Sequence, residues 1–173
     1  MAFNALNLAE IARRLGRTPE ERELRAQHRQ IADTVNALCF NEKTGFYSDF
    51  LNGHPLARRT ICGFWPLLAE VATPERAAKL VAALCDPAGF GRSCGIPTLP
   101  ADDPDYRPES GYARGPAWAH TNYMVLAGLR KYGETKLART LAERFYRAAE
   151  AIWQTTGTIW ENYSPDQCDR PPE

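Results

Sequence analysis

Helical periodicity interrupted by connections of alternating length is the feature that most constrains the fold of this chain. Apolar residues at helical spacing predict helices over about residues 3–15, 18–38, 63–71, 74–84, 117–132 and 135–153. The connections after the first, third and fifth segments are short, whereas those after the second, fourth and sixth are long. Stacked helical hairpins place their short turns on one face and their long loops on the other. The pattern therefore predicts three hairpins, with residues 41–61, 85–116 and 155–173 converging on one surface.

Local signals mark where these elements begin. Thr18-Pro19-Glu20 and Thr73-Pro74-Glu75 each offer an N-cap, a first-turn proline and a first-turn acid. A turn signal at Glu42–Gly45, followed by Phe46-Tyr47, predicts a short β-hairpin. The second and sixth helices have a charged face and the third and fifth are sparsely charged, so odd helices are expected inside and even ones outside. We predict an all-α fold, a partial (α/α)6 toroid, formed by residues 1–173 as a single domain.

Composition excludes several classes of function. The 21 basic and 21 acidic residues cancel and are scattered, so no nucleic-acid partner and no anionic membrane surface is expected. The five cysteines form no C-x-x-C pair and only three histidines are present, so neither a metal site nor a cofactor is predicted. We interpret the cysteines as reduced thiols of a cytoplasmic protein. The beginning of the chain lacks the features of a signal peptide, and no membrane-spanning segment is expected.

Two motifs combine groups suited to a sugar. Gly111–Tyr123 brings together flat apolar faces and planar hydrogen-bonding groups, which suit a pyranose ring. Trp160–Pro165 has one carboxylate, Glu161, between aromatic residues. A carboxylate in such surroundings can hold a water for attack or donate a proton. The expected substrate contacts are Tyr112, Arg114, Gly115, Trp118, Asn122 and Tyr163.

At these motifs the chain resembles the trehalase-like (α/α)6 glycosidases, in particular the glycoside hydrolase family 63 and mannosylglycerate hydrolase-like group. The resemblance covers nearly the whole chain. It extends over Gly45–Asp49, Phe64–Leu67, Gly95–Thr98, Ala101–Pro104, Gly111–Tyr123 and Glu161–Pro165.

The resemblance implies an inverting glycosidase that acts on a small glucoside or related sugar. It gives Glu161 the role of general base and Tyr112 that of a substrate-contacting aromatic. Two departures are Ala113 and Ala119, where members of the group usually have Trp and Pro. The general-acid aspartate of the group lies upstream of the segment that corresponds to Met1, so no residue of this chain matches it. We therefore expect the isolated chain to be weakly active or inactive as an enzyme.

Purely structural roles are alternatives to several of these assignments. Trp65 is interpreted as a core residue and His120 as a satisfied core histidine, and Arg114 is as suited to brace a carboxylate as to bind substrate. An acid role is weighed for the loop residues and set below turn formation and capping. Those residues are Asp102, Asp103, Asp105 and Glu109.

Two further classes of function stay open. A non-catalytic sugar-binding or remnant module would explain the missing acid, and a tetratricopeptide-like scaffold is weaker because no period of about 34 residues is present. The partners expected are a small carbohydrate and either a second copy of the chain or a missing N-terminal half. Such an association would cover inner apolar faces that half a toroid leaves exposed.

Overall fold

The computed structural model describes residues 1–170, which form six α-helices, one 3-10 helix and three two-stranded antiparallel sheets. The helices are α1 (Ala2–Arg14), α2 (Thr18–Leu38), η1 (Ile61–Phe64), α3 (Trp65–Leu68), α4 (Pro74–Cys85), α5 (Ala119–Lys131) and α6 (Thr135–Thr156). The sheets pair β1 (Phe40–Asn41) with β2 (Phe46–Tyr47), β3 (Phe50–Leu51) with β4 (His54–Pro55), and β5 (Ala117–Trp118) with β6 (Asn162–Tyr163).

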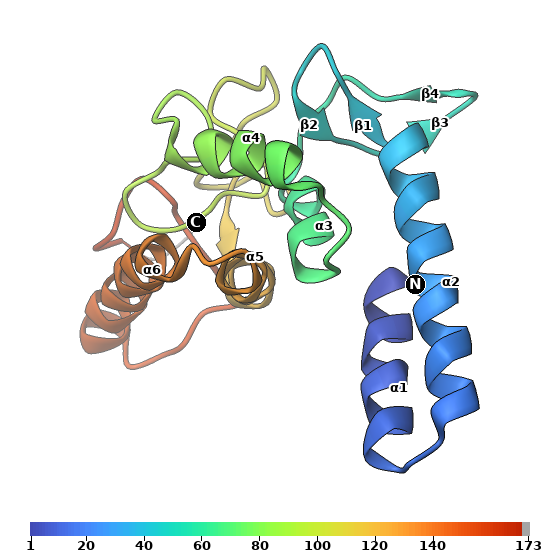
Figure 1. The fold of residues 1–173 in the computed structure, drawn as a ribbon. Coiled ribbons are helices and arrows are strands. Elements are labelled where there is room, and N and C mark those ends of the chain that lie inside the picture. The colour runs from blue at the N-terminus through green and yellow to red at the C-terminus, as the bar shows by residue number, and fades with distance from the viewer. Residues whose placement is uncertain (171–173) are drawn as a thin grey trace.

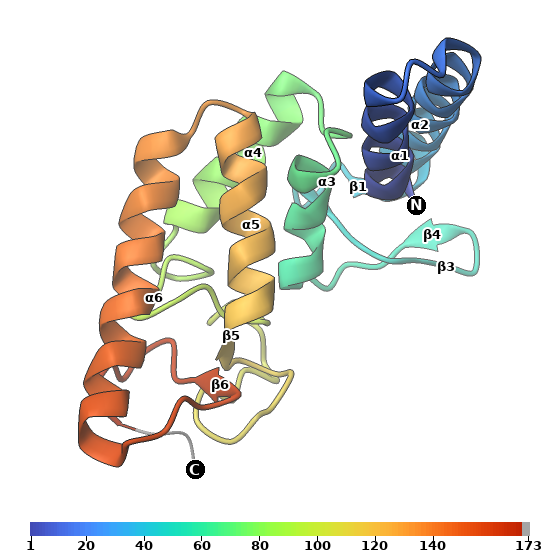
Figure 2. The same ribbon diagram turned by 90° about the horizontal axis from the view of Figure 1, so that it is seen from below.

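Short connections join α1 to α2, α3 to α4 and α5 to α6. α1 packs on α2, and α5 packs between α3 and α6 (Figure 1). Turned by 90°, the molecule shows its short helix connections at one end and its long loops, with β5 and β6, at the other (Figure 2). This arrangement confirms the prediction of a partial toroid with the long loops on one face.

The third helix is much shorter than its predicted range of 63–71. The chain forms η1 and then one turn of α helix, and Glu70 has left-handed backbone with φ 53°. The amides of Val71 and Ala72 both donate to the carbonyl of Pro66, at 2.9 and 3.4 Å, which closes the helix end. A tight turn thus replaces the second half of the helix.

The two predicted N-caps have different outcomes. The Thr73 side chain accepts a hydrogen bond from the Arg76 amide at 3.3 Å, as expected of an N-cap. Thr18 instead lies inside α2, whose N-cap residue, Arg17, makes no side-chain capping bond. The fifth helix begins two residues later than predicted, because Ala117 and Trp118 form β5.

An aromatic cluster is the centre of the core. Phe46, Phe64 and Phe90 are almost fully buried, with ring centroids 4.9 to 5.6 Å apart. Aliphatic residues from α4 and α5 complete this core. A Cβ on Gly128 would lie 2.7 Å from the Leu68 amide nitrogen, so glycine lets α5 pack closely on α3.

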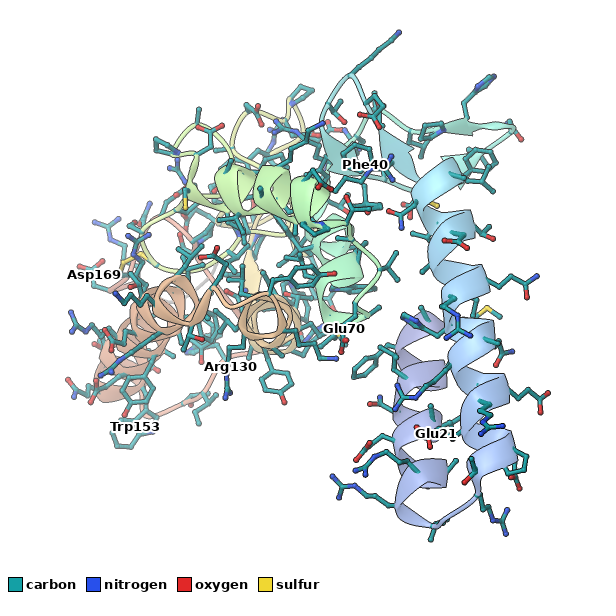
Figure 3. The ribbon with its side chains drawn as sticks, viewed as in Figure 1. Glu21, Phe40, Glu70, Arg130, Trp153 and Asp169 are labelled. Atoms are coloured by element: carbon teal, nitrogen blue, oxygen red, sulfur yellow. A yellow bond between two sulfur atoms is a disulfide. The ribbon has the colours of Figure 1, made fainter. Side chains whose placement is uncertain are left out.

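The two edges of the half-toroid expose apolar side chains. On α1 the exposed residues include Leu8 and Ile11, and on α5 and α6 they include Tyr123, Tyr146 and Trp153. Figure 3 shows Trp153 on the outer side of α6. We still predict that these edges associate with a second copy of the chain or with another half-toroid. Light scattering, which measures the mass of the particle in solution, tests this prediction.

Candidate active site

A cavity of about 480 Å³ opens at the loop end of η1, α3 and α5. Its walls are mainly apolar and include three aromatic residues, Trp65, Tyr112 and Trp118. The other lining residues are Asp49, Thr60, Ile61, Cys62, Thr98, Ala113, His120, Thr121 and Met124. A concave site with aromatic faces and a few polar groups suits a small sugar.

Tyr112 and Trp118 form one preorganised wall of this cavity. Their rings meet edge to face at 4.7 Å, and the Trp118 indole N–H donates to the Tyr112 carbonyl at 3.0 Å. Tyr112 has left-handed backbone, φ 52°, which is a strained conformation for a residue with a side chain. Its side chain is 60% exposed, so the ring is free to meet a ligand.

A short antiparallel ladder joins the two sequence motifs. Ala117 pairs with Tyr163 and Trp118 pairs with Asn162. Continuing this register by one residue sets Glu161 beside Ala119, the first residue of α5. The backbone of Glu161, an exposed residue, therefore lies next to the segment that carries Trp118, although Glu161 is not among the residues that line the cavity.

A covalent bond and an ion pair hold the segment that follows Glu161. Cys94 and Cys168 form a disulfide with Cα atoms 5.2 Å apart, and the Cys94 amide donates to the Pro165 carbonyl at 2.9 Å. Arg92 contacts the carboxylate of Asp166 at 2.5 Å. The interpretation of all five cysteines as reduced thiols is wrong for this pair. Disulfides are typical of oxidising compartments, so the cytoplasmic prediction loses the support it took from reduced thiols.

Hydrogen bonds add to this clamp. The Tyr106 hydroxyl donates to the other oxygen of Asp166 at 2.8 Å. The buried hydroxyl of Ser164 donates to Glu109 at 2.7 Å and accepts from two backbone amides of the tail. Burial, followed by the Asp166 carboxylate, raises the pKa of Tyr106 well above its usual value. The clamp therefore fixes β6, and with it the backbone beside Glu161.

Several expected substrate contacts have structural positions instead. Asn122 is buried, and its amide bonds the Ile96 backbone at both polar atoms and the Trp118 carbonyl. Tyr163 is buried, and its hydroxyl accepts from the Trp160 amide at 3.1 Å. Gly115 is buried at φ 148°, where a Cβ would lie 2.8 Å from Arg107 backbone atoms. These three residues shape the walls behind the site rather than its surface.

Arg114 and His120 also differ from expectation. Arg114 is exposed, does not line the cavity, and has a minor share, after Arg58, in lowering the pKa of Asp105. His120 is exposed at the cavity rim, 5.6 Å from the Trp118 ring, so its interpretation as a core histidine is wrong. Trp65, interpreted as core, is 38% exposed and lines the cavity.

The loop acids weighed as a general acid are all engaged elsewhere. Asp102 pairs with Arg59, and Asp103 and Asp105 both pair with Arg58. Glu109 accepts the bond from Ser164 described above. Sequence reasoning passed over a different acid, Asp49, which lines the cavity. The only signal for Asp49 was its place in the Gly45–Asp49 motif, directly after the predicted hairpin.

Stacked helical hairpins with an aromatic cavity at the loop end define the class of (α/α)6 glycosidases. The chain belongs to one family of that class, the family described as the mannosylglycerate hydrolase MGH1-like glycoside hydrolase domain, which matches residues 1–170.

Individual relatives agree with this assignment. The mannosylglycerate hydrolase MGH1 of Selaginella moellendorffii is 32% identical over 155 residues, which are 87% of this chain and 30% of the relative. The solved GH63 mannosylglycerate hydrolase from Thermus thermophilus in complex with glucose is 26% identical, with a TM-score of 0.81 over 99% of this chain and 42% of that one. The neutral trehalase Nth1 of Saccharomyces cerevisiae, 20% identical with a TM-score of 0.68 over 86% of this chain and 28% of that one, shares the fold.

The chain spans only part of its relatives. It covers between 29% and 35% of the length of the first four curated proteins that it matches. In the part of the chain that the structure describes, none of the helices has the length and apolar character needed to span a bilayer. Residues 1–170 also contain no group of three or more His, Cys, Asp or Glu side chains able to hold a metal ion.

Proposed function

We propose that this chain is the base-bearing half of an inverting glycosidase site for a small hexoside. In this role Glu161 accepts a proton from a water molecule, whose oxygen attacks the anomeric carbon of a sugar held against Trp118 and Tyr112. The observation that carries the proposal is the β5–β6 ladder, which joins the segment of Glu161 to the aromatic wall of the cavity. The names of the relatives support a mannosylglycerate-like or glucoside substrate.

The chemistry also needs a second carboxyl group. Inversion uses an acid about 6.5 to 9.5 Å from the base, on the other face of the sugar. The loop acids of this chain are occupied by Arg58, Arg59 and Ser164. We therefore expect the isolated chain to hydrolyse glycosides about 10²- to 10⁴-fold more slowly than an enzyme with both groups.

Two measurements test this proposal together. Quenching of tryptophan fluorescence by methyl glucoside, methyl mannoside and glucosylglycerate reports binding, because Trp65 and Trp118 line the cavity. Release of nitrophenol from aryl glycosides reports turnover. Glu161→Gln should abolish any residual turnover and leave binding unchanged, whereas Glu150→Gln, an exposed control on α6, should change neither. Residual turnover that survives Glu161→Gln would contradict the assignment of the base.

The engagement of the loop acids also favours a second candidate, a non-catalytic sugar-binding module. This module would use the same aromatic cavity without hydrolysis. Calorimetric titration with glucose, trehalose and glucosylglycerate separates the two candidates. Binding without any turnover supports the sugar-binding module. The absence of both binding and turnover supports a remnant module without a sugar site.

A further inference from the structure

Asp49 is the carboxylate that faces the proposed sugar cavity. It follows β2 closely, is exposed, and lines the cavity together with Tyr112 and Trp118. Its backbone carbonyl accepts from the Leu56 amide at 2.7 Å, which ties the residue to the second hairpin. Within residues 1–170 neither side-chain oxygen of Asp49 accepts a hydrogen bond from a protein group, so both oxygens are open to a ligand.

The contrast with the neighbouring acids makes this openness informative. Asp102, Asp103 and Asp105 lie in the adjacent loop, and arginines of the 56–60 segment neutralise all three. Asp49 has no such ion pair within the described residues. The chain thus leaves one carboxylate unpaired where the cavity opens.

The charge of the cavity follows from its lining. Of the twelve lining residues identified within positions 1–170, Asp49 is the one acid, and none is lysine or arginine. The field of Asp49 reaches the cavity wall: burial first, and the Asp49 charge after it, raise the pKa of the Cys62 thiol. An anionic ligand would meet this charge without a lysine or arginine among the lining residues to offset it, whereas hydroxyl groups can donate to both carboxylate oxygens.

We propose that Asp49 is a substrate-binding and specificity-determining residue, which accepts hydrogen bonds from adjacent hydroxyls of a neutral pyranose stacked on Trp118. This inference rests on the proposed function and deepens it. Its consequence is that the cavity holds the uncharged glycosyl unit and disfavours uronic acids. The carboxylate of an acidic aglycone such as glycerate would have to lie outside the walls formed by these residues.

The inference is tested by binding measurements on the whole chain. Asp49→Asn keeps the size of the side chain and removes its charge, and Asp49→Ala removes both acceptors. Asp33→Asn, at an exposed position of α2, is the matched control. Affinity for methyl glucoside should fall about 10-fold in Asp49→Asn and up to about 100-fold in Asp49→Ala, the range expected for hydrogen bonds to a charged group. The ratio of affinities for methyl glucuronide and methyl glucoside should rise in Asp49→Asn.

Each outcome separates this inference from the proposed function. If the wild-type chain binds the neutral sugar and both Asp49 variants bind it equally well, the role of Asp49 is refuted and the sugar site stands. If the wild-type chain binds none of the sugars, the proposed function fails and this inference fails with it. Alkylation of Cys62 by iodoacetamide supplies a second readout: sugar should slow it in the wild type and protect less in Asp49→Asn. Near-UV circular dichroism confirms that each variant is folded.

Discussion

The first helical hairpin and the rest of the molecule are stabilised in different ways. The buried residues of α1 are all alanines. None of the residues of α2, all of which the structure describes, is buried. The body formed by α3 to α6 and the long loops has large buried aromatic and aliphatic residues and a disulfide. In Figure 1 the hairpin stands to one side of this body.

The junction between the two regions combines hydrogen bonds with a small apolar contact, in which Val35 of α2 packs against the core. His28 hydrogen-bonds the Ala69 carbonyl at 2.8 Å, and the Asn36 amide donates to the Val71 carbonyl at 2.8 Å. Next to these bonds lies an apolar groove of about 490 Å³ between the hairpin and α3. The difference indicates that the body, which also contains the cavity and Glu161, carries most of the stability, and that the hairpin is attached by a few hydrogen bonds and limited apolar packing.

The largest expected effect is the loss of a core aromatic ring. Phe64 is fully buried against Phe46 and Phe90, so Phe64→Ala should lower the free energy of unfolding by about 3–5 kcal/mol. Leu8→Ala on the half-exposed face of α1 should change it by no more than about 0.5 kcal/mol. Urea denaturation followed by circular dichroism measures both. Equal losses would show that the hairpin is as well packed as the body.

Removal of the disulfide should have the next largest effect. The bond closes a loop with a sequence separation of 74 residues, so the Cys94→Ser, Cys168→Ser double variant should be destabilised by about 2–4 kcal/mol. The exposed free cysteine Cys85 provides the control, Cys85→Ser. Dithiothreitol should lower the melting temperature of the wild type and leave that of the double variant unchanged. If hydrogen exchange in the double variant accelerates in α1 and α2 rather than in the tail, the view that the disulfide stabilises the body and not the hairpin is contradicted.

The hydrogen bonds of Asn36 provide a test of how the hairpin is attached to the body. Asn36→Ala removes the bond to Val71 and an acceptor of the Arg76 guanidinium at 2.9 Å, so the junction should weaken by about 1–3 kcal/mol. Hydrogen exchange should become faster in α1 and α2 while the core of the body keeps its protection. Asn7→Ala, at an exposed position of α1, serves as the control. Uniform acceleration across the whole chain would mean that hairpin and body unfold as one unit.

The smallest expected effect is electrostatic and confined to α1. Hydrogen bonds from Arg13 and then Arg14 lower the pKa of Glu10 from 4.5 to about 2. Because the folded-state pKa is below the unfolded one, this contribution to stability is present above pH 4.5 and is lost as the pH falls toward 2. An NMR titration of the Glu10 side chain should give a midpoint near 2, which moves upward in the Arg13→Gln, Arg14→Gln variant. A midpoint near 4.5 in the wild type would contradict these ion pairs.

Local patterns predicted the helices better than the site. The apolar spacing placed five of the six helices within a few residues of their observed limits, and the Thr73 cap is confirmed, because these signals act over one or two helical turns. The third helix is shorter than predicted because its end depends on the turn at Glu70. Periodicity alone does not report a single left-handed residue.

The site depends on contacts between distant residues. Trp118 and Asn122 were both expected to contact a sugar, and both are largely buried. Trp118 nevertheless lines the cavity, whereas the Asn122 amide is bonded to the Ile96 backbone. The pairing of Trp118 with Asn162, and of Cys94 with Cys168, joins segments whose separation in the chain hides their contact. Asp49 had no distinguishing pattern until the fold placed it in the cavity wall.

By itself, the sequence determined the order of helices, the alternation of short and long connections and the motifs that resemble a glycosidase family. Helix periodicity and turn chemistry are local, so they can be read along the chain. Only the tertiary structure decided which polar side chains are used to hold the fold and which stay open to a ligand. Burial and hydrogen-bond partners are set by residues far apart in sequence, and this is why Asn122 holds the fold while Asp49 faces the cavity.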